Sequence, residues 1–522
     1  MIGFDRILYL VLAALVAMLP FEFRSFPILS NLQWMFIAVA LSSLPVLVRE
    51  RKMLLHSRLV RAAVLFVVTQ WVAAVLAPEF AGNAVKAAVR VTAGFILLCA
   101  TLGLRTRKRT LQVWSVAAVF AAVYAMADFG GFGLPQLFRE QNFYIRNVPR
   151  LSGSFEYPNT AAAYFALSLP IIWAELKSRW FRVGGFMVVA SALIITYSRA
   201  AGVAALLAIA IWAITSNKRS EFQSAILFGM LFFGFLFLNH DLYQRFSLQL
   251  HTKDFSAQYQ PEFNLTQERP NVSSSVLIHV RNTGATTWET KPTDPFILAH
   301  RWYDAEKKTY VREAAERMLV PTPVRPQESV DIEASFRTPD KAGVYLLTWD
   351  IFSEESGWFS RQGVYPGIVE VHIDQDKEPW SGHTDIGRWL GRDTSSLFVA
   401  NVPYSRNELW IAAARMAQKH PIFGVGPDNF RLLYGRQYGA NRWDTKIRAN
   451  SLYLELLSGS GLVGLAAFCV MMAVVRWKPN ASSIGLGIFL MHGVMDTFLM
   501  TTPIYFAFWI LLGQSEDITQ TS

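Results

Sequence analysis

The sequence contains the stretch FQSAILFGMLFFGFLFLN at residues 222–239, which carries no acidic or basic side chain. A helix of this length measures about 27 Å at 1.5 Å per residue, close to the ~30 Å thickness of the hydrocarbon core of a bilayer. An uncharged apolar run of this length is typical of membrane helices, so the stretch predicts a helix that spans a membrane.

Comparable apolar runs recur along the chain, and together they predict about twelve spans. They lie near residues 6–20, 33–48, 59–77, 86–104, 111–128, 159–176, 183–197, 201–215, 222–239, 451–475, 482–497 and 501–513. The last two are short and could instead form one helix kinked around Pro503. Of the 522 residues, 52% are hydrophobic and 17% are charged, whereas soluble proteins carry about 25% charged residues. This composition excludes a purely soluble enzyme.

The distribution of lysine and arginine predicts the orientation of these spans. Five alternate connections, near residues 49–61, 105–109, 177–182, 218–219 and 476–478, hold 16 basic residues. Connections rich in lysine and arginine remain in the cytoplasm, so the N-terminus is predicted to be cytoplasmic and residues 240–450 extracytoplasmic. The basic residues of these connections, which orient the chain in the membrane, then account for the net charge of +10. No nucleic-acid partner is expected.

The extracytoplasmic segment contains a domain of its own. Apolar and polar residues alternate around residues 276–280, 330–336 and 369–373, with turn-forming residues between them. Short strands of this kind predict a β-sandwich over 260–375. The stretch Asn282-Thr283-Gly284 followed by Trp288 resembles bacterial immunoglobulin-like modules. Its tryptophans (Trp288, Trp302, Trp349 and Trp358) fit core packing better than a platform for stacking sugars.

The predicted domain order follows from these boundaries. Helices one to nine occupy 1–239, an outer linker 240–259, the sandwich 260–375, an outer loop 376–450, and helices ten to twelve with a cytoplasmic tail 451–522. Within the outer loop, residues 406–420 have apolar side chains at helical spacing among basic ones. This amphipathic pattern predicts a helix along the outer membrane boundary, ended by Pro421.

No motif of a soluble enzyme is present. The sequence has no P-loop, no G-x-S-x-G elbow and no H-E-x-x-H helix, and Cys99 and Cys469 both lie within apolar runs. We therefore expect no metal and no nucleotide cofactor.

Polar residues at the outer ends of the spans are the candidates for function. Arg199 lies in a tight connection between two apolar helices, where an arginine is expensive and is by default a functional candidate. The alternative is that its side chain merely extends to the lipid headgroups. Asn159 stands where the sixth span begins, and an N-cap would account for it fully.

Four segments resemble the O-antigen ligase and O-antigen polymerase superfamily of bacterial envelope glycosyltransferases. They are 153–155 with 158–159, 197–199, 406–410 leading into 420–430, and 450–457 with 461–465. Their order, the twelve predicted spans and the large outer loop before the tenth span fit that superfamily. The resemblance covers nearly the whole chain except the inserted sandwich.

The resemblance implies a GT-C-like helical body that transfers a glycan from undecaprenyl diphosphate to a hydroxyl on a polysaccharide or lipid A-core acceptor. The reaction would take place at the outer face of the bacterial inner membrane, beside other envelope assembly proteins. The catalytic residues would be Arg199, Arg406, Asn450 and Glu156, and the substrate would be bound by Asn159, Tyr197, Arg431, Arg448, Tyr453 and Asp428. Arginines would stabilise the charge on the leaving diphosphate.

One position departs from the pattern. Ligases of this superfamily carry a histidine immediately before the asparagine that opens the tenth span, and here that residue is Ala449. A base could instead come from Glu156, Asp428 or Glu455. This departure leaves polymerase and ligase both open and shifts weight towards a polymerase.

Two other classes of protein remain possible on the sequence alone. Twelve spans also fit a polysaccharide transporter or flippase, although transporters bind their substrates near the bilayer midplane. A catalytically altered family member that binds glycans at the membrane is the other alternative.

Overall fold

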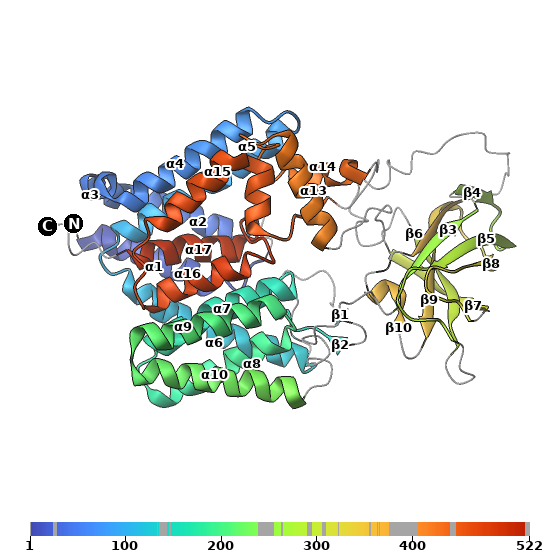
Figure 1. Cartoon of the computed structure of the whole chain (residues 1–522), viewed down its shortest axis with the longest axis horizontal. Coiled ribbons are helices and arrows are strands. Elements are labelled where there is room, and N and C mark those ends of the chain that lie inside the picture. Colours follow the sequence, from blue (N-terminus) through green and yellow to red (C-terminus); the bar gives the residue numbers. More distant parts are fainter. Residues whose placement is uncertain are drawn as a thin grey trace.

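A computed structural model of the chain shows a body of long helices and a separate unit of β-strands (Figure 1). It describes residues 2–23, 29–132, 134, 144–145, 148–238, 255–262, 265–289, 295–304, 309–321, 323–353, 357–362, 364, 366–374, 406–438 and 445–516. The predicted outer linker is thus described only from residue 255, and the predicted outer loop only from residue 406. The last residues of the predicted cytoplasmic tail, 517–522, lie outside the described residues.

A helix occupies each of the twelve stretches for which the sequence predicts a span. These helices are α1 (Ile2–Met18), α2 (Asn31–Arg49), α4 (Arg58–Val75), α5 (Ala81–Gly103), α6 (Lys108–Phe129), α7 (Pro158–Glu175), α8 (Arg179–Ile195), α9 (Arg199–Ser216), α10 (Arg219–Leu238), α15 (Leu452–Ala473), α16 (Ala481–His492) and α17 (Thr502–Ser515). Within the described residues, seven of them (α2, α4, α5, α6, α9, α10 and α15) are long and apolar enough to cross a membrane. The chain is a polytopic helical membrane protein, and the count of twelve crossings stays a prediction.

The interpretation of the last two runs as one kinked helix is wrong. α16 and α17 are separate helices, because residues 493–501 form a connection between them. Pro503 lies in the first turn of α17, where its missing N–H breaks no hydrogen bond. The connection covers the start of α15, since the amide of Leu452 donates to the carbonyls of Gly493 (2.7 Å) and Asp496 (3.1 Å).

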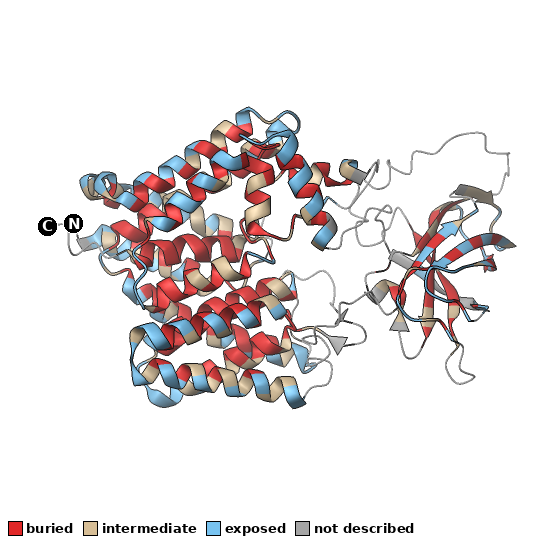
Figure 2. Cartoon of the chain, in the orientation of Figure 1, coloured by how far each residue is buried: buried red, intermediate tan, exposed pale blue. Residues whose placement is uncertain are grey.

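Burial in the helical body separates a packed centre from an apolar outer surface. α7 is buried along most of its length and contacts α6, α8, α9 and α16, whereas α10 at the edge is largely exposed (Figure 2). Large apolar side chains such as Trp180 and Leu238 are 85% and 90% exposed. Apolar side chains on the outside are expected of helices that face lipid, and the alanines buried in α7 let its neighbours approach closely.

α13 (Arg406–Lys419) and α14 (Phe430–Leu433) lie on the side of the helical body that faces the β-strands (Figure 1). α13 packs against α15, and its apolar residues Leu409, Ala413 and Met416 are buried in one cluster with Phe430. The predicted helix is therefore present, one residue shorter than expected. Its apolar stripe faces protein, and the position of the helix along the outer membrane boundary stays a prediction.

α15 is broken at Gly461, where φ is 66° and ψ is −167°. The turn that follows α13 fits into this break. The amides of Val425 and Gly426 donate to the carbonyls of Ser458 (2.8 Å) and Gly459 (2.9 Å), which the break leaves without partners in the helix. The glycines of the motif around residue 424 thus join two backbones.

The strands form two sheets around a shared core. They are β3 (Ala257–Pro261), β4 (Leu265–Glu268), β5 (Ser273–Asn282), β6 (Ile297–Asp304), β7 (Thr309–Leu319), β8 (Ser329–Arg337), β9 (Gly343–Ser353), β10 (Gly357–Trp358) and β11 (Gly367–Ile373). One sheet has the order β3-β5-β8, and the other has the order β4-β11-β9-β6-β7 with β10 beside β9. A short hairpin, β1 (Tyr144–Ile145) with β2 (Val148–Pro149), precedes α7 in the chain. The relation of the β-strand unit to immunoglobulin-like modules stays a prediction.

The tryptophans of the β-strand unit mainly fill its core. Trp288, Trp302 and Trp349 are at most 1% exposed, so they offer no surface to a sugar. Trp358 is partly exposed and lies under the guanidinium of Arg301, 4.0 Å from the ring centre. Asn282 is buried and bridges its turn, since its side chain donates to the carbonyl of Val324 at 2.9 Å. The motif that suggested the fold therefore has a structural role.

We predict that Asp350 makes the β-strand unit less stable as the pH rises. Burial raises its pKa to about 6 from 3.8, and its oxygens accept from the Tyr259 hydroxyl (3.2 Å) and the Ser360 amide (3.1 Å). The unfolded chain loses this proton first, so the stabilisation present below pH 4 is lost as the pH rises through 6. Asparagine does not ionise, so the variant Asp350→Asn escapes this loss. The free energy of unfolding of the variant minus that of the wild type should therefore be about 2 kcal/mol larger at pH 7 than at pH 4.

Amide hydrogen exchange in β9 and β11 of the full chain in detergent measures this difference. Asp340→Asn, at an exposed carboxylate in the turn between β8 and β9, is the control, and its exchange should follow that of the wild type at both pH values. Equal protection of wild type and Asp350→Asn at pH 7 would contradict the prediction.

Candidate active site

A first polar cluster forms around Asn159 and Asp496. α7 begins at Pro158 with Tyr157 as its N-cap residue, so Asn159 lies inside the first turn and the N-cap interpretation is wrong. The amide oxygen of Asn159 accepts from Arg150 Nη2 (2.7 Å), and its Nδ2 donates to Asp496 Oδ2 (3.0 Å). One side chain thus joins the segment before α7 to the connection between α16 and α17.

Arg406 and Arg199 approach the same place from two other elements. Arg406 Nη2, at the start of α13, lies 3.9 Å from Asp496 Oδ2, and Arg406 repels Arg199 electrostatically. Arg150 Nε donates to the carbonyl of Thr196 at 2.8 Å, in the turn that leads into α9. Tyr197 follows in that turn with a left-handed backbone (φ 56°) and is buried. We call Arg150, Asn159, Arg199, Arg406 and Asp496 the Asp496 cluster.

The Asp496 cluster has an excess of positive charge. Arg150 and Arg406 lie around Asp496, and Arg199 lies near Arg406. Burial lowers the pKa of Arg150 only to about 10, opposed by Asp496 and assisted by Arg406, so Arg150 keeps its charge at neutral pH. His492 lies beside Asp496, with 3.4 Å between Nε2 and Oδ2, and adds a further positive charge only when protonated.

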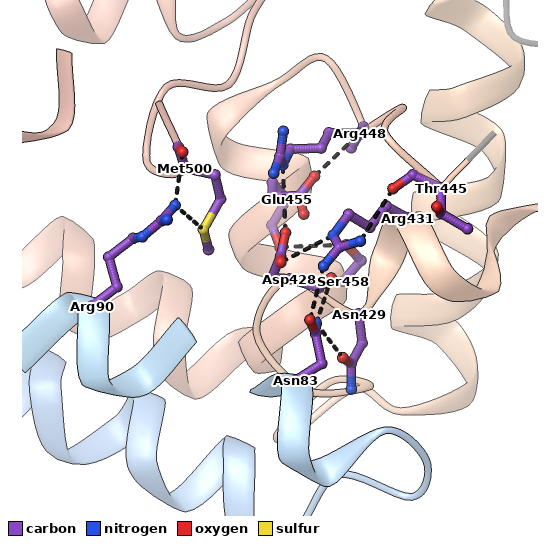
Figure 3. A network of polar contacts seen from close by, with 11 residues as sticks. Asn83, Arg90, Asp428, Asn429, Arg431, Thr445, Arg448, Glu455, Ser458 and Met500 are labelled. Atoms are coloured by element: carbon purple, nitrogen blue, oxygen red, sulfur yellow. Dashed lines mark hydrogen bonds and ion pairs between the residues drawn. The ribbon is translucent and has the colours of Figure 1, made fainter. Parts of the chain in front are cut away.

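A second network surrounds Asp428, at the turn between α13 and α14 (Figure 3). Asp428 has a left-handed backbone (φ 61°), and its two oxygens contact Arg431 Nε (3.0 Å) and Arg448 Nε (3.4 Å). Arg431 also donates to Asn83 of α5 at 2.8 Å. We call Asn83, Asp428, Arg431 and Arg448 the Asp428 cluster.

The residues at the start of α15 lie close to the Asp428 cluster. The amide of Ala449 donates to Glu455 Oε2 (3.0 Å), and the carbonyl of Asn450 accepts from Trp410 of α13 at 3.4 Å. Glu455 is 5% exposed, and its Oε1 has no hydrogen-bond partner among the described residues. The hydroxyl of Tyr453 donates to the carbonyl of Leu490 at 3.0 Å, a contact between α15 and α16.

Two carboxylates, Glu22 and Glu156, lie near one another where α7 and α17 begin. Burial raises the pKa of Glu22, and Glu156 raises it further, against hydrogen bonds to Ser30 and Thr502. The hydroxyl of Ser154 donates to the carbonyl of Pro20, which holds the segment of Glu22 beside that of Glu156. Two like charges in one place favour a proton on one of them, and burial favours Glu22 for it.

The structure brings most of the predicted residues into these groups. Arg199, Arg406 and Asn159 meet in the Asp496 cluster, Arg431, Arg448 and Asp428 in the Asp428 cluster, and Glu156 lies beside Glu22. Tyr453 is placed in a helix contact. The sequence did not single out Arg90, Arg150, Glu22 or Asp496 as site residues. An arginine inside an apolar run was the signal available for Arg90.

A match to a known protein family falls on one part of this site. Residues 378–469 match the family model described as O-antigen ligase. This domain supports a membrane glycosyltransferase of the general O-antigen ligase and polymerase type. It contains Arg406, the Asp428 turn and the first part of α15, and it begins only after β11, so the β-strand unit is not part of it. No curated protein matches the chain.

Proposed function

We propose that the protein transfers a glycan from undecaprenyl diphosphate to an acceptor hydroxyl at the extracytoplasmic face of the bacterial inner membrane. The observation that carries this proposal is the Asp496 cluster. Arg150, Arg199 and Arg406 come from three segments far apart in the sequence, and in the described part of the chain they gather near Asp496. Their excess charge suits a diphosphate, because guanidinium groups bind phosphoryl oxygens in fixed geometry.

The reaction follows from this arrangement. The acceptor hydroxyl attacks the anomeric carbon of the glycan, a new glycosidic bond forms, and the bond between that carbon and the diphosphate oxygen breaks. Negative charge then grows on the leaving diphosphate. Cations already in place around it stabilise this charge without reorganisation, which lowers the barrier. The mechanism asks for no metal or nucleotide.

The proton of the acceptor hydroxyl goes to a carboxylate in this proposal. Ala449 cannot accept it, since alanine stands where related ligases have histidine. Glu156 is the favoured base, because it lies three residues before Asn159 and beside Glu22, whose pKa is raised by burial and by Glu156 itself. A positioned base contributes typically 10²–10⁴-fold to such a step.

The N- and C-termini are proposed to be cytoplasmic, as the basic connections indicate. The β-strand unit and both clusters then lie on the extracytoplasmic side, where lipid-linked glycans are assembled. Both clusters are built at helix ends, which favours a transferase over a transporter that binds near the membrane midplane.

Purified protein in detergent, given an undecaprenyl diphosphate-linked glycan, tests the proposal. We expect a longer or ligated glycan together with free undecaprenyl diphosphate, formed only when an acceptor is present. In cells, deletion of the gene should leave single repeats on lipid A if the protein is a polymerase, or long chains on the lipid carrier if it is a ligase. No transfer to either acceptor and an unchanged surface glycan would refute the function.

A further inference from the structure

Arg90 is a cation inside a membrane helix, and no acidic partner lies within ion-pair distance of it among the described residues. It belongs to α5, and its Nη1 donates to the carbonyl of Met500 (2.7 Å) and contacts the sulfur of the same residue (3.4 Å). A carbonyl and a thioether are neutral, so they solvate the guanidinium without balancing its charge. Such a residue in a membrane protein is a functional candidate.

Arg448 belongs to the same group of charges. Arg448 repels Arg90, while Asp428 and Glu22 attract it from beyond ion-pair distance. Asp428 is shared, because Arg431 holds it at 3.0 Å and Arg448 reaches it through Nε alone at 3.4 Å. Within the described residues, the two terminal nitrogens of Arg448 make no hydrogen bond. Figure 3 shows Arg90 beside Met500 on one side of the view and Arg448 beside Glu455 on the other.

Glu455 gives an independent sign that a ligand belongs here. Its side chain is 5% exposed, yet Oε1 has no partner in the described part of the chain, while Oε2 accepts from Ala449. A buried carboxylate oxygen without a donor is costly. A sugar hydroxyl next to an anionic group would supply this hydrogen bond.

We propose that Arg90 and Arg448 form a second anion site, which takes a phosphoryl group carried by the acceptor, with Glu455 receiving a hydroxyl of the adjoining sugar. The site is distinct from the Asp496 cluster but close to it, because Asp496 and Met500 belong to the same connection of residues 493–501. Assignment of the ligand to the acceptor rests on the proposed function, whereas the anion site itself does not.

The phosphoryl group has two possible sources. A second lipid-linked glycan would bring its diphosphate, as in chain polymerisation, and a phosphorylated core oligosaccharide would bring a phosphate on a sugar. Both share the chemistry that arginines recognise. The experiment must therefore separate a lipid diphosphate from a lipid-free sugar phosphate.

Binding stoichiometry in detergent tests the site without any need for catalysis. Farnesyl diphosphate and glucose 1-phosphate serve as probes, measured by native mass spectrometry on the full chain. We expect the wild type to bind two phosphoryl ligands. Arg90→Gln and Arg448→Gln should each weaken binding at the second anion site at least tenfold and leave binding at the Asp496 cluster unchanged. Arg406→Gln should weaken binding only at the Asp496 cluster.

The outcomes distinguish the sources and the proposals. Farnesyl diphosphate in both sites supports a lipid-linked acceptor, and glucose 1-phosphate in the second site alone supports a phosphorylated core. Arg436→Gln is the matched control, since its guanidinium is paired with Glu79 at 2.6 Å, and it should keep both sites. Either of two results overturns the second site, even if transfer is observed. One is a single bound ligand in the wild type. The other is two ligands bound by Arg90→Gln, with the binding of Arg90→Lys also unchanged from the wild type.

Discussion

Arg199→Ala is expected to reduce glycan transfer by about 10²–10³-fold while the protein still inserts and stays folded. The reason is electrostatic: removal of one fixed donor to a developing anion has this order of effect in other enzymes. Arg199 is exposed at the first turn of α9, so its loss removes little packing. The rate of release of undecaprenyl diphosphate by purified protein measures the effect.

Two further variants define the cause of that loss. Arg199→Lys keeps the charge but not the planar guanidinium, so it should retain an intermediate rate. Arg415→Ala is the control, because this exposed arginine of α13 reaches the carbonyl of Gln437 (3.2 Å) and belongs to neither cluster. Wild-type transfer by Arg199→Ala would remove this residue from the proposed diphosphate site.

The helical body could be predicted from the sequence because its signal is local. Each apolar run is long enough to specify a helix by itself, and a helix is found at all twelve places. For α16 and α17 the sequence predicted two runs but left open whether they form one kinked helix. Their separation involves a contact with α15, because the amide of Leu452 donates to the carbonyls of Gly493 and Asp496 in the connection between the two helices.

The candidate site could be predicted only in part, for a related reason. Arg199 stands out because it lies in a tight connection between two apolar helices, and Arg406 because it begins an amphipathic one. Asp496 does not stand out, since its role comes from a contact with Asn159, which is 337 positions away in the chain. Asn159 itself was open to a local explanation, helix capping, that the start of α7 at Pro158 rules out. Residues that acquire meaning only through distant partners are the ones that sequence patterns miss.

The β-strand unit illustrates the opposite case, in which a local motif is informative about structure alone. Asn282 and Trp288 carry the resemblance to immunoglobulin-like modules, and both are fully buried. Alternation of apolar residues in β5 and β8 was visible in the sequence, and the same residues form the inner face of one sheet. The order of the strands was not predictable, because β4 pairs with β11 from the far end of the unit.

Gly461→Ala is expected to destabilise the helical body by about 2–6 kcal/mol, from backbone strain and overpacking together. Gly461 has φ 66° and ψ −167°, a backbone conformation essentially restricted to glycine. A Cβ at this position would lie 2.2 Å from the carbonyl oxygen of Ile422. The methyl group would separate α15 from the turn that follows α13, and that turn cannot yield easily because its backbone is hydrogen-bonded to α15 on both sides of the break.

The thermal midpoint of the detergent-purified chain, with Gly487→Ala as the matched control, measures this effect. Gly487 lies in α16 with open space where a Cβ would be, so alanine there should leave the midpoint unchanged or raise it slightly. Gly424→Ala should lower the thermal midpoint in the same way, because Gly424 lies in the turn that contacts α15 and its Cβ would lie 2.5 Å from the backbone of Gly459. Arg406 lies before the turn that is hydrogen-bonded to α15, and Asp428 lies in that turn. The Gly461→Ala protein should therefore lose transfer activity even at temperatures where it remains folded. A Gly461→Ala protein with the midpoint and activity of the wild type would show that the two backbones are not joined as described.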